Sequence, residues 1–379
     1  MVRYVPLLLC MLLVVPNPVA AQSAAKQSAA FFASDQIPHL EIELEKKELE
    51  ALRRAPRTYA KATLKVGESV YPNIGLHVKG AAGSFRGIDD KPCLTFNMDK
   101  FGGEKLFHGM DKWHVSNSVQ DPTYLHELIC GELFRAAGVP ASRVGHAIIS
   151  INGRKRGLFY IKEGYDSQFL KAHFKTSDGN FYDGGFLREI DQPLQLLRGK
   201  NDVKDRADLK ALVAAANEPN KDLRFQKLEK VLDMDRFISY LVLEVIVWDW
   251  DGYPMNRNNY RIYHDPKRDK IVFIPSGMDQ MFGNPGGPIL MGFQGLVARA
   301  VMNTPEGQKR YMARMKEIHE QVFVPEKLIK RIDELQPRVQ AALMSVDKNA
   351  GRDYPNQLAR MRSLIRERSK AIERQLNKK

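Results

Sequence analysis

Apolar and polar residues alternate in short runs through the first half of the chain, a pattern typical of β-strands with one buried face. From Ile37 to Arg54 the pattern predicts a short strand and then a helix. Residues 58–66 and 72–79 alternate around the turn letters GES and predict a hairpin, and Cys93 begins a third strand. A glycine-bearing loop runs from Lys79 to Gly87. The pattern therefore predicts a β-sheet with a loop over one edge.

A helix signal begins at Asp121, which precedes Pro122 and an apolar run that ends at Gly138. Asp is a preferred N-cap, Pro is favoured at the first helical position and Gly marks helix ends, so a helix of about sixteen residues is predicted. Two apolar runs then flank Asn152-Gly153, the strongest short hairpin signal. Sheet, helix and hairpin thus follow one another.

The second half of the chain carries longer periodic segments. Residues 191–223 are polar and charged, with a helical stretch at the letters ADLKALVAAA. The apolar run from Asp235 to Trp248 predicts a buried helix or strand, and it is too short to cross a bilayer. Strands with the letters YRIYH and KIVFI follow, and from Glu306 to the end a period of about 3.6 predicts helices. We therefore expect an α-rich second half.

The N-terminus has the three-part layout of a secretory leader: Arg3, an apolar run from Val5 to Val15, and small residues that end at Ala21. The run is well short of the ~20 residues that span a bilayer, so we expect cleavage after Ala21 and a secreted or periplasmic protein. No later segment has the pattern of a transmembrane helix. Cys93 and Cys130 then remain, so an ordinary apolar core must hold the fold, and a bridge between them is left open.

The formal net charge is +13, which raises the question of a nucleic-acid partner. Part of the excess lies in the tail from Arg352 to Lys379, where nine Lys and Arg residues accompany three acidic ones. We interpret this tail as a solvated helix. No RNA- or DNA-binding motif accompanies the charge, so ATP, an acidic substrate or an anionic envelope surface is the better match, and no nucleic acid is expected.

The residue types that phosphoryl transfer requires are concentrated between Trp248 and Gly283. Such chemistry needs one carboxylate to orient the attacking hydroxyl, and an Asp with an Asn to hold the Mg²⁺ that neutralises the phosphates. Asp251 and Asn256 have the five-residue spacing of a kinase catalytic Asp and its metal-binding Asn, and Asp279 follows after two strands and a turn. Each of these residues alone is an ordinary turn former, so the prediction rests on their combination.

We expect the glycine-bearing loop to supply a cation for the nucleotide phosphates. Lys79 ends a strand immediately before Gly80, and loop amides around Gly83 and Ser84 would cover the phosphates. Lys91 is the competing lysine. The histidines show no metal-ligand spacing and no GxSxG motif occurs, so zinc and serine-hydrolase chemistry are not expected.

The letters D…NNYRIYHDP…IVFIP..MDQMFG resemble the signature of the CotH (spore-coat-protein-H-like) kinase family. Supporting stretches are HVKGAAGSF at 77–85, DPTYLHELICGELFRAAGVPASR at 121–143 and INGRKRGLFYIKEGYDSQFL at 151–170. The family is similar in architecture to protein kinases and to secreted Golgi-type kinases. The resemblance implies an α+β, two-lobed, atypical protein-kinase-like fold, with a β-rich N-lobe over residues 36–163 and an α-rich C-lobe over 164–379 that includes the polar insertion and the basic tail.

The same resemblance implies roles for the acidic segment. Asp251 would be the catalytic base and Asp279 the ligand of Mg²⁺ or Mn²⁺. The companion Asn is open, because counting from Asp251 selects Asn256, whereas counting back from the Asn-Tyr pair of the family selects Asn259.

The resemblance further implies a helix carboxylate that holds the lysine, and Glu127 fits that position. Glu132 is a close alternative, because it lies centrally in the apolar stripe of the predicted helix, whereas Glu127 points roughly opposite. Glu163 would fall at the hinge between the lobes, where its backbone would meet adenine.

The implied function is a secreted, ATP-dependent protein kinase that transfers the γ-phosphate to hydroxyl side chains of an exported protein. Family members commonly carry Trp-Asp-x-Asp before the Phe-Gly, where this chain has Ser276 and Gly277, so one carboxylate is lost. Two alternatives follow: a catalytically silent kinase fold that serves as a binding or coat-assembly module, and transfer of AMP from ATP to a protein.

Overall fold

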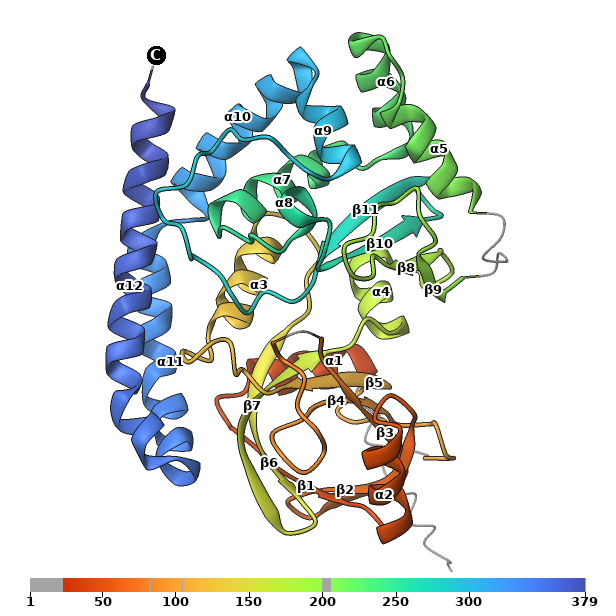
Figure 1. Ribbon diagram of the computed structural model, residues 1–379, viewed down its shortest axis with the longest axis vertical. Coiled ribbons are helices and arrows are strands. Elements are labelled where there is room, and N and C mark those ends of the chain that lie inside the picture. The colour runs from red at the N-terminus through yellow and green to blue at the C-terminus, as the bar shows by residue number, and fades with distance from the viewer. Residues whose placement is uncertain (1–22, 82, 104, 200–205, 379) are drawn as a thin grey trace, which may run out of the picture.

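A computed structural model describes residues 23–378 except 82, 104 and 200–205. The protein is a mixed α+β structure in which a β-rich part and a helical part are stacked along the long axis (Figure 1). The predicted leader, residues 1–21, lies outside the described residues. Within the described part of the chain, no helix combines the length and the apolar character needed to cross a bilayer.

The β-rich part is a closed barrel of seven strands in the order β1-β2-β3-β4-β5-β7-β6. Its strands are β1 (His39–Glu43), β2 (Ala60–Val66), β3 (Ser69–Lys79), β4 (Cys93–Asn97), β5 (Lys112–Ser116), β6 (Val144–Ile151) and β7 (Arg154–Glu163). The open edge expected from the sequence is absent from this sheet, because β1 pairs with β2 on one side and, in parallel, with β6 on the other. An apolar core that includes Leu40, Leu76, Phe96 and Trp113 fills the barrel.

Both predicted hairpins of the barrel are confirmed. The β2–β3 hairpin turns at Gly67, and the β6–β7 hairpin turns at Asn152-Gly153. Asn152 and Gly153 have φ values of 47° and 76°, the left-handed region that this type of turn requires at both positions.

The helix predicted from Asp121 begins later than expected. Helix α3 (His126–Ala136) has 11 residues, and Leu125 stands at its N-cap without a capping side chain. The Asp121 carboxylate instead accepts hydrogen bonds from the backbone N–H groups of Leu125 at 3.1 Å and His126 at 2.9 Å. Asp121 therefore satisfies free N–H donors at the start of the helix from the preceding turn. The sequence signal identified Asp121 as the residue that caps these donors, but the helix begins at His126 and not at Pro122.

The helical part contains a second sheet, in the order β11-β10-β8-β9. Strands β10 (Tyr260–Asp265) and β11 (Lys270–Pro275) are the two that the sequence predicted, and they pair antiparallel. Strands β8 (Phe181–Asp183) and β9 (Gln195–Arg198) were not predicted, because three and four residues are too few to display an alternating pattern.

The remaining elements are helices, and the apolar run near residue 240 is one of them, α7. They are α1 (Ala24–Ala33), α2 (Lys46–Arg54), α4 (Ser167–Phe174), α5 (Ala207–Ala216), α6 (Lys221–Val231), α7 (Met234–Ile246), α8 (Tyr253–Asn256), α9 (Leu296–Met302), α10 (Pro305–Gln321), α11 (Pro325–Val346) and α12 (Lys348–Leu376). The helix predicted within residues 191–223 is confirmed as α5, and the helices predicted from residue 306 onward are confirmed as α10–α12.

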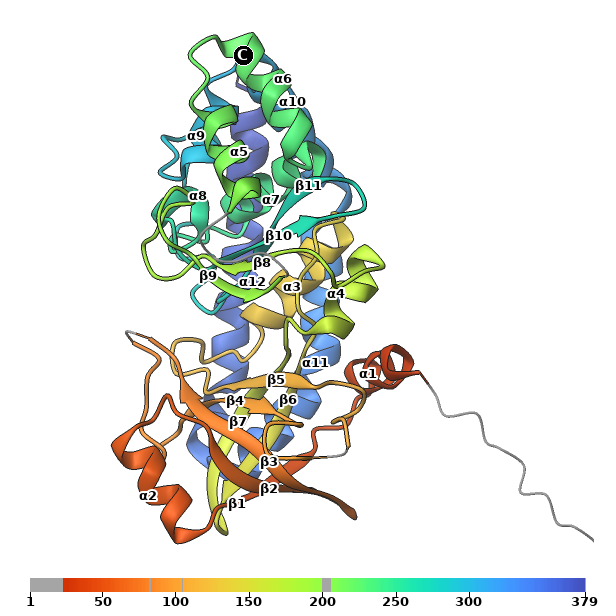
Figure 2. The ribbon, with the colours of Figure 1, turned by 90° about the vertical axis from the view of Figure 1, so that its right-hand side faces the viewer.

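Helix α12 is more than a solvated tail. It runs beside the helical part, and with α11 it reaches down alongside the barrel (Figures 1 and 2). One face is buried, and that face includes Arg368, whose side chain is 0% exposed. The Tyr354 hydroxyl donates to the carbonyl of Thr123 at 2.8 Å, which fastens α12 to the segment that leads into α3.

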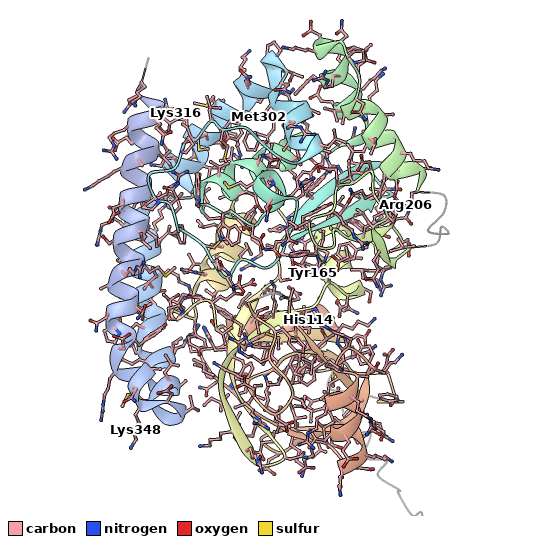
Figure 3. All side chains as sticks on the ribbon, viewed as in Figure 1. His114, Tyr165, Arg206, Met302, Lys316 and Lys348 are labelled. Carbon is pink, nitrogen blue, oxygen red and sulfur yellow. The ribbon has the colours of Figure 1, made fainter. Side chains whose placement is uncertain are left out.

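The barrel and the helical part meet around β5 and the segment after β7. Figure 3 labels two side chains at this junction, His114 on β5 and Tyr165 after β7. The Tyr165 hydroxyl donates to the carbonyl of Pro275 at the end of β11, 2.7 Å away. Cys93 and Cys130 are both buried and free, so the bridge that the sequence left open does not form.

Candidate functional site

A cavity of about 630 Å³ lies between one end of the barrel and the helical part. Eight of the predicted site residues line it: Lys79, Gly80, Ser84, Glu127, Asp251, Asn256, Asn259 and Asp279. The ninth, Gly83, lies against the Gln120 side chain, which also lines the cavity. A larger cavity of about 860 Å³ between α7 and α10 contains none of these residues, and its arginines are paired with acidic side chains.

The most distinctive contact in the cavity is an ion pair between β7 and α3. Lys162 Nζ lies 2.7 Å from Glu127 Oε2, and both side chains are buried. Burial alone lowers the pKa of Lys162, but the charge of Glu127, with Tyr165 and Asp279 nearby, outweighs it and the net pKa is raised. The lysine is therefore cationic, and the helix holds it at the cavity wall.

The predicted pairing of Glu127 with Lys79 or Lys91 was wrong. The sequence favoured Lys79, with Lys91 as the competing lysine, but Lys162 is the residue that pairs with Glu127. Lys79 lines the same cavity from the end of β3, and its pKa is lowered by burial and by the charge of Lys162. Lys91 does not line the cavity, because its ammonium group donates to the Tyr124 hydroxyl at 2.7 Å.

Glu132 is excluded as the partner of the cavity lysine. Its carboxylate accepts from Arg331 of α11 at 2.9 Å, on the outer side of α3. The apolar stripe favoured Glu132 as a buried position, but α3 is buried on most sides, so that Glu127 is buried as well. Glu163 also departs from expectation: its backbone N–H donates to the carbonyl of Arg143 at 2.9 Å.

Asp251 lies in the turn between α7 and α8, and three asparagines orient its carboxylate. Asn256, Asn258 and Asn259 donate to it through their side-chain amides at 2.7, 2.9 and 3.1 Å. All four residues line the cavity. The clustered amides in the sequence thus form one network around a single carboxylate.

Asp279 follows β11 on the same cavity wall. Burial, and next the charge of Glu127, raise the pKa of its carboxyl to about 6. Its backbone carbonyl lies 3.0 Å from His126 Nδ1 at the start of α3. Asp279 is therefore coupled to α3 both through charge and through this contact.

Gly277 explains how Asn259 comes close to this segment. Its φ is +71°, and a Cβ atom there would lie 2.7 Å from Asn259 Oδ1. The Asn259 amide also lies 3.4 Å from the Gly277 carbonyl. A larger residue at position 277 would displace Asn259. The glycine found here, in place of the Asp of the Trp-Asp-x-Asp pattern, therefore fits the close approach of Asn259.

The family model described as CotH kinase protein matches residues 76–372, which is most of the chain. The chain belongs to the CotH kinase family. Membership supports a kinase-type function and implies the use of ATP. The match includes β4 to β11, α3 and the Asp251 segment, so the cavity described above is a feature of the family region.

Curated relatives bear the names of the same family. Invasin CotH3 of Rhizopus delemar is 27% identical over 43% of this chain and 30% of that protein. Inner spore coat protein H of Bacillus subtilis is 22% identical over 62% of this chain and 68% of that protein. The chain thus spans about a third of the length of the fungal relatives it matches.

Two solved structures show a weak likeness. The Helicobacter pylori proinflammatory kinase CtkA has a TM-score of 0.35 at 6% identity, over 78% of this chain and 96% of that one. HipA of Shewanella oneidensis, in its complex with HipB and operator DNA, has a TM-score of 0.30 at 12% identity, over 80% and 68%. TM-scores this low do not establish a shared fold.

Beneath the Asp251 turn, this CotH chain buries a second pair of acids. Glu244 and Asp249 are both 0% exposed, and burial raises the pKa of each well above its ordinary value. A Cβ atom on Gly252 would lie 1.9 Å from Glu244 Oε2, so the turn rests directly on this carboxyl group. The pair therefore supports the backbone that presents Asp251.

The cavity contains oxygen donors suited to a hard divalent cation. The Asp279 carboxylate and the amide oxygens of Asn256 and Asn259 are ligand types that Mg²⁺ accepts, usually with one or two carboxylates completed by phosphate and water. Among the residues that the structure describes, no group of three or more His, Cys, Asp or Glu side chains stands ready to hold a metal. A cation here would therefore rely on the asparagines and the nucleotide.

The sequence did not predict several polar residues of the cavity, among them Lys162 and Asn258. Lys162 lies in the letters LFYIKE at the end of a buried strand, and a lysine in such a run needs an anionic partner. That signal, combined with the Glu127 helix, could have identified it. Asn258 gave no separate signal, since its role depends on how the turn after α8 folds back to Asp251.

Proposed function

We propose that this chain is a secreted protein kinase that transfers the γ-phosphate of ATP to hydroxyl side chains of an exported protein. The observation that carries the proposal is the buried Lys162–Glu127 pair, which opens into the same cavity as Asp251 and Asp279. A kinase site requires this combination of a lysine held by a helix carboxylate, a base and a metal-binding Asp. The barrel would serve as the N-lobe, residues 36–163, and residues 164–379 as the C-lobe.

The nucleotide phosphates would bind at the barrel end of the cavity. Lys162 would contact them, held in place by Glu127, and Lys79 would add a second positive charge beside the loop of Gly80, Gly83 and Ser84. The pairing with Glu127 keeps Lys162 cationic and fixes its position before the nucleotide arrives, which reduces the ordering cost of binding.

Asp279 would hold Mg²⁺ or Mn²⁺ together with an asparagine. Asn259 is the better companion, because it contacts both the Asp251 carboxylate and the Gly277 carbonyl two residues before Asp279. Asn256 is the second choice, since its side-chain amide donates to Asp251 but, among the described residues, makes no hydrogen bond to the segment that leads to Asp279. The metal, when bound, neutralises charge on the phosphates.

Asp251 would act as the base. In the reaction the acceptor oxygen forms a bond to the γ-phosphorus, the bond from that phosphorus to the β,γ-bridging oxygen breaks, and ADP leaves. The hydroxyl proton passes to the Asp251 carboxylate, whose orientation is fixed by its three amide donors.

The place of action is part of the proposal. The leader-like N-terminus predicts export, and relatives carry the names invasin and inner spore coat protein, which fits an extracellular or coat location. The acceptor would then be a protein of the same compartment.

The test is to incubate the protein with γ-labelled ATP and Mg²⁺ or Mn²⁺ and then to measure the intact mass of the proteins in the mixture. A mass gain of about 80 Da indicates transfer of phosphate, and a gain of about 329 Da indicates transfer of AMP. Asp251→Ala should reduce transfer by ~10²-fold or more while ATP binding persists. Asp269→Ala, an exposed turn aspartate outside the cavity, is the control. No mass gain in the wild-type chain would support the silent module instead.

A further inference from the structure

A groove of about 470 Å³ adjoins the catalytic cavity on the side of Asp251. It shares Gln120, Trp250 and Gln280 with that cavity. Trp250 is the neighbour of Asp251 in the chain and is 45% exposed. A large aromatic side chain left this exposed beside a site is a common feature of binding surfaces. The groove therefore continues from the position of the proposed base.

Helix α12 forms one wall of the groove. Gln357, Arg360, Met361 and Leu364 face it from this helix, and Pro122, Thr123 and His126 face it from the segment that begins α3. Met281 and Met361 are 4% and 1% exposed and make its floor apolar. The groove thus combines an apolar floor with the exposed indole of Trp250.

Arg360 gives the groove its charge. It is the one permanently charged side chain among the described residues that line the groove, and it is exposed. Within the described part of the chain it has no ion pair or hydrogen bond, whereas its neighbour Arg362 pairs with Asp333 at 2.6 Å. An unpaired guanidinium at an apolar groove is complementary to a carboxylate.

We infer that this groove binds the acceptor polypeptide, through an apolar side chain and an acidic side chain next to the hydroxyl that is phosphorylated. The inference rests on the proposed function and names its substrate class. The nucleotide would occupy the opposite side, where Lys162, Lys79 and the glycine loop lie on the barrel. The acceptor must reach Asp251, and the groove is the path that leads there.

The test uses the whole chain with γ-labelled ATP and serine peptides in which Glu, Lys or Ala is scanned through the flanking positions. The wild type should label the best Glu peptide about fivefold faster than its Ala counterpart, the size of a partly exposed ion pair. Arg360→Glu should lose this preference and favour Lys. Arg366→Glu, an exposed arginine of the same helix that lines neither cavity, should keep the wild-type preference.

A second variant separates the two possible occupants. Leu364→Gln should raise the KM for the peptide, because it makes the groove wall polar. If it raises the KM for ATP instead, the groove belongs to the nucleotide and the inference is wrong. Labelling without any charge preference overturns the groove assignment and leaves the kinase proposal standing. Absence of label on every peptide refutes the kinase proposal itself, and the groove assignment with it.

Discussion

At the scale of single residues, the clearest feature of the site is the buried ion pair of Lys162 with Glu127. Each is almost fully removed from water, so each depends on the other to remain charged inside the protein. The gain of such a pair over two apolar residues is small, but the loss of one partner is costly. A lysine held in this way has the charge and the fixed position that the proposed contact with nucleotide phosphates requires.

Replacing Lys162 with Met should lower the free energy of unfolding by ~3–5 kcal/mol, because Glu127 is left buried without a cation. ATP binding should be lost in the same variant. The double variant Lys162→Met with Glu127→Leu should recover most of the stability and none of the binding. Urea unfolding and calorimetric ATP titration measure the two effects, and a stable single variant would contradict the pairing.

Lys79→Ala should weaken ATP binding with little change in stability, because Lys79 forms no ion pair among the described residues. Lys91→Ala should leave ATP binding intact, since Lys91 lies outside the cavity. Thermal shift with ATP and metal compares them. Loss of the shift in Lys91→Ala alone would reverse the assignment.

The pKa of Asp279, raised to about 6, gives the site a pH dependence. Because the folded state binds this proton more tightly than the unfolded chain, the group's contribution to stability falls as pH rises from about 4 to about 6. Metal-dependent ATP binding needs the carboxylate, so it should weaken about tenfold per unit below pH 6. In the Asp279→Asn variant, ATP binding should no longer show this dependence on pH. Calorimetric ATP titration at several pH values compares the variant with the wild type.

The sequence predicted most of these residues from chemistry and spacing. Residue types and distance along the chain were enough to predict Asp251 and Asp279 as a pair, and both residues line the cavity. Spacing along the chain could not identify Lys162. The pairing of β7 with β5 and β6 brings it to Glu127, which is many residues away in the sequence. Spacing reports neighbours in sequence, whereas this contact depends on the closed barrel.

At the scale of elements, helix α12 shows how a distant segment supports the site. Arg368 donates to the carbonyls of Val245 at 2.8 Å and Ile246 at 3.0 Å, the end of α7 just before the Asp251 turn. It also reaches the carbonyl of Gly287 at 2.5 Å. The basic composition of this tail predicted only a solvated helix, since composition does not distinguish a buried arginine from an exposed one.

Arg368→Met should therefore destabilise the protein by about 3 kcal/mol or more, because several buried carbonyls lose their donor. Arg366→Met, on the exposed side of the same helix, should change stability by ~0.5 kcal/mol or less. Guanidinium unfolding compares them. Equal effects of the two substitutions would show that α12 does not hold the end of α7.

At the scale of the whole molecule, the cavity is built from both parts of the structure, so a nucleotide bound there stabilises both. Saturating Mg-ATP at about 100 times its Kd should add about 2.7 kcal/mol to the stability of the full chain. Asp251→Ala should keep this gain, and adenosine without phosphates should give much less. Differential scanning calorimetry measures it, and an unchanged melting temperature would contradict nucleotide binding at the cavity.

The architecture was predicted unevenly for a physical reason. Local signals located the hairpins, α3 to within five residues, and the long C-terminal helices. The closure of the barrel was missed, because β1 pairs with β6 through backbone hydrogen bonds that leave no mark in the pattern of apolar residues. The short strands β8 and β9 were missed as well, since their pairing depends on β10.

Closure of the barrel also governs when the chain can become stable as it emerges from the ribosome. Strand β1 comes out early, but its parallel partner, with His39 opposite Ile148, follows more than a hundred residues later. Until then β1 has an unpaired edge that another chain can join. Contacts so distant in sequence form slowly. A chain arrested before residue 151 should therefore aggregate, whereas the completed barrel leaves no edge on which an aggregate can grow.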